Sequence, residues 1–149
     1  MIVKVRSVRK EDWEFILKIR NDKTVRNACH DTSIISFEQH AKYMEKINND
    51  INSHQWIVIY NGKEVGHAKI IDHEFGYMID EQFRNKGIGT KIYELVCEEA
   101  KKLGIKRLHY TAKIDNQVSL KVALKMGFIQ KDIIKKDGKH YAYSLDKKL

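Results

Sequence analysis

The sequence predicts a single α/β domain in which a mixed sheet of about seven strands is flanked by helices. Three observations predict it: short segments in which apolar and polar residues alternate, longer segments with apolar residues at helical spacing, and turn residues between them. In chain order these segments run β-α-α-β-β-β-α-β-α-β-β. The chain has 149 residues and no proline, linker or repeat that would divide it. We therefore expect one domain over residues 1–149.

The first part of the chain is expected to form one strand and two helices. Residues 2–8 alternate, which is typical of a strand, and Asp12 can cap the helix that follows it. Residues 21–33 are polar, and we expect them to form a loop. Ser36 and Gln39 have the spacing of a capping box, which predicts the start of the second helix.

Three consecutive strands are expected next, over residues 56–60, 65–71 and 75–79. Asn61-Gly62 lies between the first two strands. This dipeptide suits a tight turn with positive φ angles, so it predicts a β-hairpin.

The last part of the chain alternates between helices and strands. A helix with Ile92, Val96, Ala100 and Leu103 on one face is expected to end at Gly104. A strand over 107–112 and a helix over 116–125 come next. Two final strands, 128–134 and 141–145, flank Asp137-Gly138, a second hairpin signal.

The turn between residues 84 and 90 carries the clearest chemical signal. Its sequence is Arg84-Asn85-Lys86-Gly87-Ile88-Gly89-Thr90, between a predicted strand and a predicted helix. Such a turn can present backbone N–H groups to a phosphate, and the helix dipole adds positive charge. The P-loop spacing and the dinucleotide-binding spacing Gly-x-Gly-x-x-Gly are both absent. On this pattern alone, a tight turn without a ligand remains an alternative.

A second signature, downstream of this turn, makes the pattern more specific. Asn116-x-x-Ser119 opens the next helix and Gly127-Phe128 ends it. Together with the lead-in from Ile79 and the Arg-x-x-Gly-x-Gly turn, the chain resembles the GNAT superfamily of N-acetyltransferases, whose pyrophosphate motif is Gln/Arg-x-x-Gly-x-Gly/Ala. The resemblance covers essentially the whole chain and is weakest over residues 20–50. It implies the GNAT fold and direct transfer of an acetyl group from acetyl-CoA to a primary amine.

The resemblance also implies which residues hold the cofactor. The pantetheine arm would lie along the fourth strand and the pyrophosphate on the glycine-rich turn, with further contacts from the helix opened by Asn116. A backbone N–H near the end of the strand would polarise the thioester carbonyl. The cofactor residues carried over are Tyr77, Met78, Ile79, Arg84, Asn85, Lys86, Gly87, Ile88, Gly89, Thr90, Asn116 and Ser119.

The proton-transfer residues are less well defined by the sequence. Members of the superfamily often place Glu or His near the start of the fourth strand, where this chain has His73 and Glu74. We take this pair as the candidate base, with two solvated turn residues as the alternative. His54, His67, His109 and His140 are expected to be structural or exposed. The chain departs from many members at Ala123, where they have a tyrosine that protonates the leaving thiolate; Tyr141 and Tyr143 are substitutes to consider.

The segment from Arg20 to Arg26 resembles acetyltransferases that act on nucleotide-linked amino sugars. Arg20, Asn21 and Arg26 are the candidate substrate-binding residues, because guanidinium groups bind phosphate as charged forks. An amino sugar is therefore the expected acceptor. A protein N-terminus or lysine is the alternative within the same chemistry, and a CoA-binding domain without turnover is the alternative outside it.

Charge and cysteine content limit the remaining choices. Of the 28 lysines and arginines, 13 lie from residue 100 onward, against four aspartates there. This favours an anionic partner such as coenzyme A, although a solvated lysine-rich face also explains it. We do not expect nucleic acid as a partner, since its usual motifs are absent. The two cysteines, one of them Cys97 in a predicted helix core, suit the cytoplasm. No membrane segment and no metal are expected, and a homodimer is one option.

Overall fold

A computed structural model describes residues 2–149, so Met1 of the predicted domain lies outside the described part. The predicted mixed sheet is confirmed: seven strands follow the order β1-β2-β3-β4-β5-β7-β6. Only the pair β4–β5 is parallel among these strands, and the other neighbours are antiparallel. The strands are β1 (Val3–Ser7), β2 (Ser53–Tyr60), β3 (Lys63–Ile71), β4 (Glu74–Ile79), β5 (Arg107–Lys113), β6 (Ile129–Lys136) and β7 (Lys139–Lys148).

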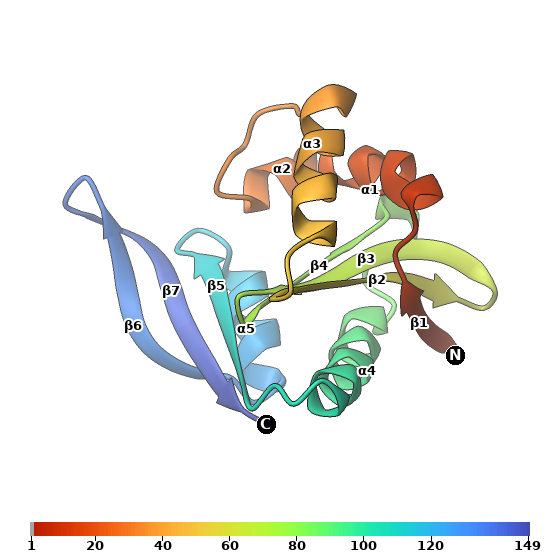
Figure 1. The fold of residues 1–149 in the computed structure, drawn as a ribbon. Coiled ribbons are helices and arrows are strands. Elements are labelled where there is room, and N and C mark those ends of the chain that lie inside the picture. The colour runs from red at the N-terminus through yellow and green to blue at the C-terminus, as the bar shows by residue number, and fades with distance from the viewer. Residues whose placement is uncertain (1) are drawn as a thin grey trace.

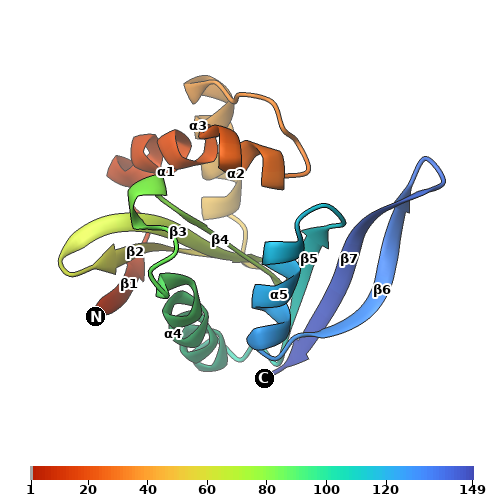
Figure 2. The ribbon, with the colours of Figure 1, turned by 180° about the vertical axis from the view of Figure 1, so that it is seen from behind.

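Helices cover both faces of this sheet, as Figures 1 and 2 show from opposite sides. One face, called here the α1–α3 face, carries α1 (Trp13–Arg20), α2 (Lys23–Ala28) and α3 (Phe37–Asn48). The other, the α4–α5 face, carries α4 (Ile88–Lys102) and α5 (Gln117–Lys125). Two short 3-10 turns, Lys10–Asp12 and Glu81–Phe83, precede α1 and α4.

Helix α2 corrects one prediction, because it lies inside the segment expected to be a loop. The side chain of Asp22 accepts a hydrogen bond from Val25 N and caps the helix. With six residues, α2 is too short to show the apolar periodicity that identifies a helix from sequence. Asp12 also differs in detail: it stands before α1, but its carboxylate accepts from Arg9 N and from Arg6.

The other local signals are confirmed. Ser36 and Gln39 form both hydrogen bonds of the capping box that opens α3. Asn61 and Gly62 have φ angles of 48° and 84°, and Asp137 and Gly138 have 53° and 76°. Each pair joins two antiparallel strands, as positive φ angles at both turn positions require in a two-residue hairpin.

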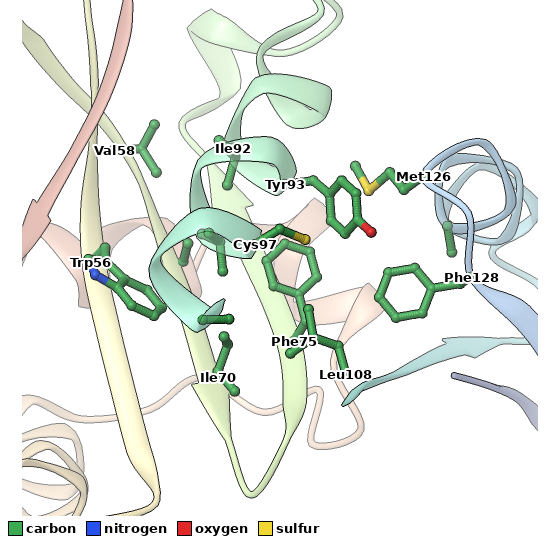
Figure 3. Close-up of a cluster of buried hydrophobic side chains, with 14 of the residues drawn as sticks. Trp56, Val58, Ile70, Phe75, Ile92, Tyr93, Cys97, Leu108, Met126 and Phe128 are labelled. Carbon is green, nitrogen blue, oxygen red and sulfur yellow. The ribbon is translucent and has the colours of Figure 1, made fainter. Parts of the chain in front are cut away.

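The larger core lies between the sheet and the α4–α5 face. Tyr93 and Cys97 of α4 contact Phe75 of β4, and Met126 and Phe128 close the core beside α5 (Figure 3). Cys97 is 8% exposed and burial raises the pKa of its thiol, as expected for a core residue. A smaller core joins the sheet to α1 and α3 through Trp13, Ile16, Met44, Ile47 and Ile57.

Strands β4 and β5 diverge, and this divergence positions the candidate site. Strand β4 pairs with β3 over its whole length, from Glu74 to Ile79. With β5 it shares one pair only, Glu74 at the start of β4 with His109, the third residue of β5. In Figure 1 the two strands separate from that point toward their carboxyl ends.

Candidate active site

The edge of β4 beyond Glu74 is open toward β5. In a continuous sheet the backbone groups along this edge would bond to the neighbouring strand. Here β5 has moved away after the pair Glu74–His109, so the stretch from Tyr77 to Ile79 lacks that strand partner. The predicted pantetheine-binding residues Tyr77, Met78 and Ile79 therefore border a gap where an extended ligand can take the place of a strand.

The glycine-rich turn lies at the carboxyl end of this open edge. Asn85 and Gly87 have φ angles of 62° and 76°, and such alternation turns successive N–H groups toward one point. Helix α4 starts at Ile88, and no side chain caps its N-terminus. Its first amides are thus available to an anion at the positive end of a 15-residue helix. The predicted residues Asn85, Lys86, Gly87, Ile88, Gly89 and Thr90 share this turn.

Gly89 lies close to the side chain of Tyr77. A Cβ atom at this position would lie 3.0 Å from the Tyr77 hydroxyl oxygen. Tyr77 points from β4 into the α4–α5 face, where burial raises the pKa of its hydroxyl. A side chain at position 89 would therefore push against Tyr77, which borders the open edge of β4.

Arg84 binds protein atoms that hold the turn in place. Its Nε donates to Ile79 O at 3.0 Å, and its Nη2 lies 3.0 Å from Asp22 Oδ2. The guanidinium group holds the pKa of the Asp22 carboxyl below its usual range. Arg84 therefore joins the end of β4 to the start of α2.

Asn116 and Ser119 lie together at the start of α5, as predicted. Asn116 caps the helix through a hydrogen bond that its Oδ1 accepts from Ser119 N at 3.1 Å. The Ser119 hydroxyl lies 2.7 Å from the hydroxyl of Tyr110, a β5 residue that the sequence did not point to. Ala123, where the resemblance expects a tyrosine, is 1% exposed in the core.

Tyr110 places a hydroxyl group on the α4–α5 face beside the gap between β4 and β5. Its ring centroid lies 6.2 Å from that of Phe75 in β4 and 5.4 Å from that of Phe128. Burial raises the pKa of Tyr110, which keeps the phenol protonated at neutral pH. The two tyrosines considered as substitutes have other partners: Tyr141 Oη lies 2.8 Å from His30 Nδ1, and Tyr143 Oη accepts from Gln117 Nε2 at 3.4 Å.

The opposite, α1–α3 face has a depression of about 430 Å³ at the point where β4 and β5 meet. Of the predicted base pair, Glu74 lines this depression. His73 lies outside it, in the exposed turn between β3 and β4, with a φ angle of 71°. The full lining comprises Tyr43, Lys69, Ile71, Asp72, Glu74, Phe75, Gly76 and His109.

His109 is the lining residue that sequence analysis set aside. Its Nδ1 lies 2.8 Å from Asp146 Oδ1 of β7, and its Nε2 lies 3.9 Å from Glu74 Oε1 of β4. Strands β4, β5 and β7 thus contribute one side chain each to a group of three neighbouring titratable residues. The sequence offers no local signal for this group, because it depends on the pairing of β4 with β5 and of β5 with β7.

The predicted substrate residues lie apart from this depression and hold the chain after α2. Arg20 Nη2 donates to Asp31 O at 2.6 Å, and Arg26 Nη1 donates to Thr32 O at 3.3 Å. The Asn21 side chain forms two hydrogen bonds with the backbone of Ile35. Asn21 also lines a second depression, of about 380 Å³, that it shares with Arg84.

Comparison with known proteins gives the family. The family model described as an acetyltransferase (GNAT) domain matches residues 3–129. The chain belongs to the GNAT acetyltransferase family. It is an N-acetyltransferase, and its sheet and flanking helices have the family's architecture.

Three solved structures illustrate the likeness of fold. Spermidine N-acetyltransferase from Vibrio cholerae, in complex with CoA and spermine, has a TM-score of 0.84 at 14% identity, over 98% of this chain and 95% of that one. An N-acetyltransferase from Staphylococcus aureus Mu50 has a TM-score of 0.81 at 20% identity, over 99% of each chain. Aminoglycoside acetyltransferase AAC(6')-Ib, in complex with coenzyme A, has a TM-score of 0.81 at 12% identity, over 99% of this chain and 95% of that one.

Two further observations concern residues 2–149. No group of three or more His, Cys, Asp or Glu side chains in this range is placed to hold a metal ion. None of the helices in the same range is long and apolar enough to cross a membrane.

Proposed function

We propose that this GNAT protein transfers the acetyl group of acetyl-CoA to the primary amine of a small molecule, without a covalent enzyme intermediate. The divergence of β4 from β5 beside the uncapped start of α4 is the observation that carries the proposal. The open edge of β4 leads directly to a turn that can bind phosphate. The depression that contains Glu74 lies on the other face of the sheet, at the closed end of the same gap.

The cofactor would be held mainly by backbone groups. The pyrophosphate binds the amides of residues 85–90, and the pantetheine arm binds the open edge of Tyr77, Met78 and Ile79. Asn116 and Ser119 border the arm from the start of α5. A backbone amide of β4, at the end of the open edge nearer Glu74, then polarises the thioester carbonyl, as a fixed dipole aimed at developing negative charge.

The transfer requires that one proton leaves the amine and one reaches the thiol. A neutral amine attacks the carbonyl carbon, the tetrahedral intermediate collapses, and the C–S bond breaks with its electron pair on sulfur. Of the predicted pair, we assign Glu74, which lines the depression, to receive the ammonium group of the acceptor; His73 is not part of the lining. The Tyr110 hydroxyl, on the α4–α5 face, would protonate the thiolate.

The lining of the depression favours a cationic acceptor. Asp72 and Glu74 place two carboxylates around it, with one lysine, Lys69, whose ammonium group lies over the Tyr43 ring. Amine substrates that carry further positive charge, such as polyamines or amino sugars, match these carboxylates. A nucleotide-linked sugar has less support, because Arg20 and Arg26 donate to carbonyl groups of the 31–32 loop.

A thermal-shift titration with acetyl-CoA tests the cofactor site. A ligand that binds only the folded state at a hundredfold excess over its Kd stabilises it by about 2.7 kcal/mol. We expect a clear upward shift in Tm for the parent. Gly89→Val should lose it while remaining folded by circular dichroism, and Gly62→Asn, in the remote β2–β3 hairpin, should keep it. Parent protein with no shift for acetyl-CoA or CoA would contradict the proposal.

A further inference from the structure

His109 is placed where the two halves of the sheet separate. It belongs to the single residue pair that joins β4 to β5, and its imidazole lines the depression on the α1–α3 face. Its backbone is fixed as well, since His109 N donates to His73 O at 2.8 Å. Tyr110, the next residue, points to the opposite face toward Ser119.

The contact with Asp146 determines which ring nitrogen of His109 carries the proton. A carboxylate can only accept, so at 2.8 Å the neutral imidazole donates its Nδ1–H to Asp146 Oδ1. The lone pair is then on Nε2, the nitrogen 3.9 Å from Glu74 Oε1. That separation is longer than a hydrogen bond, and an N–H group of an amine or a water molecule can be shared between the two side chains.

We propose that His109 is the general base of the acetyl transfer, that Asp146 is its positioning residue, and that Glu74 attracts and orients the ammonium group of the acceptor. This inference rests on the proposed function. Imidazole is suited to the task because it ordinarily gains and loses a proton near neutral pH. A carboxylate ordinarily does so only in acid.

These groups account for every proton that moves during the reaction. His109 Nε2 takes one proton from the acceptor ammonium, and the freed nitrogen lone pair attacks the thioester carbon. As the intermediate collapses and the thiolate leaves, the nitrogen gives up its second proton, which the sulfur gains through Tyr110 or solvent. The imidazolium then returns its proton to solvent. The net reaction converts ammonium and thioester into amide, thiol and one released proton.

The charged and titratable groups around His109 come from several elements of the fold. Glu74 from β4 and Asp146 from β7 are in direct range, and Asp72 lines the same depression. Lys69 from β3 opposes them, and Tyr43 from α3 faces the depression without charge at neutral pH. Two carboxylates are thus in direct range of the ring and can attract a cationic acceptor to it.

The test compares His109→Gln and Asp146→Asn with the parent, with His140→Gln as the matched control on an exposed part of β7. Thiol release from acetyl-CoA is followed from pH 5.5 to 9.5 with spermidine and with glucosamine as acceptors. We expect His109→Gln to lower kcat/KM by about 10²- to 10³-fold and to lose the rise of rate with pH near neutrality. Asp146→Asn should cost about tenfold and shift the ring 15N signals of His109, because the proton is no longer held on Nδ1.

The outcomes separate this inference from the function on which it rests. Acetyl-CoA should raise the Tm of His109→Gln as much as that of the parent. If His109→Gln stays within about threefold of the parent and keeps its pH profile, His109 is not the base, although the protein is an acetyltransferase. If the parent releases thiol with neither amine, the proposed function and the inference both fail.

Discussion

The two faces of the sheet differ in what they contain and in how they bind. The α4–α5 face is covered by a large apolar and aromatic core, and its proposed cofactor site consists largely of backbone groups. The α1–α3 face has a small core, and its depression is lined by charged side chains. All three buried polar or charged side chains among residues 2–149, namely Asp12, His40 and His67, lie on this second face.

Each of these three polar side chains has a structural partner. Asp12 receives two hydrogen bonds from Arg6 of β1, and His40 of α3 lies 2.8 Å from Trp13 O of α1. His67 of β3 lies 2.9 Å from Gln55 Oε1. Its β-sheet neighbours Ile57 and Met78 both belong to the smaller core.

The difference suggests a division of labour within the fold. A cofactor common to a whole family can be bound by backbone geometry, which tolerates much change of sequence. An acceptor has to be recognised by side chains, so the face that receives it depends on a few charged and polar groups. Substitutions on the two faces should therefore have separable effects.

Next to His109→Gln, the largest separable effect is expected for Glu74→Gln. This substitution keeps the shape of the side chain and removes the negative charge from the depression. Without the carboxylate that attracts and orients the ammonium group, kcat/KM for amines should fall by about 10²-fold or more. The stabilisation by acetyl-CoA should not change, because the cofactor lies on the other face. Thiol-release kinetics and thermal shift measured on the same preparation check both statements.

Glu98→Gln is the control, since this exposed glutamate of α4 lies on the cofactor side of the sheet. It should match the parent in both assays. A Glu74→Gln protein that responds more weakly to acetyl-CoA would show that the two faces are coupled, and the division proposed above would be wrong.

The next effect concerns the pH dependence of stability, which should arise on the α1–α3 face. Burial lowers the pKa of His67 to about 3, while the unfolded chain binds the same proton near pH 6.5. Stability is therefore full above pH 6.5 and declines as the pH falls toward 3. Between pH 7.5 and pH 5 the free energy of unfolding should drop by about 2 kcal/mol. His40, whose pKa burial also lowers, acts in the same direction.

Urea unfolding of the parent and of His67→Gln at both pH values measures this effect. The variant should lose most of the difference, because glutamine does not titrate and can still bond to Gln55. Asp12 does not contribute in this window: Arg6 lowers the pKa of Asp12 below 3.8, so its contribution is lost only in stronger acid. Equal pH dependence in the parent and the variant would mean that His67 is not the cause.

The α4–α5 face was the more predictable one because its determinants are local in sequence. Gly87, Gly89 and the cap Asn116 each act within one turn of chain, and the structure has the predicted turn and cap. Hairpins at Asn61-Gly62 and Asp137-Gly138 were predictable for the same reason. Short helix α2 was not, since six residues carry no periodic pattern.

The α1–α3 face depends on contacts between distant segments, and sequence reasoning did not reach them. His109 meets Glu74 and Asp146 through the register of three strands, which no motif fixes. Arg20 and Arg26 show the opposite problem: a guanidinium group suits a phosphate and a loop carbonyl equally well, and only the fold shows that it binds the loop. The sequence likewise showed that the tyrosine was missing at Ala123, but not that Tyr110 brings a hydroxyl group to Ser119.

Tyr110→Phe is expected to have the smallest of these effects on activity. It tests whether β5 connects the chemistry on the two faces of the sheet. Neighbouring residues of β5 place His109 on one face and Tyr110 on the other, so proton release and proton uptake would be served by one strand. Tyr110→Phe removes only the hydroxyl and should lower kcat by about 3- to 10-fold, with little change in the affinity for acetyl-CoA. Ser119→Ala, which leaves the phenol in place, should cost less. A Tyr110→Phe protein with the parental kcat would show that solvent protonates the thiolate, and the link between the faces would then be His109 alone.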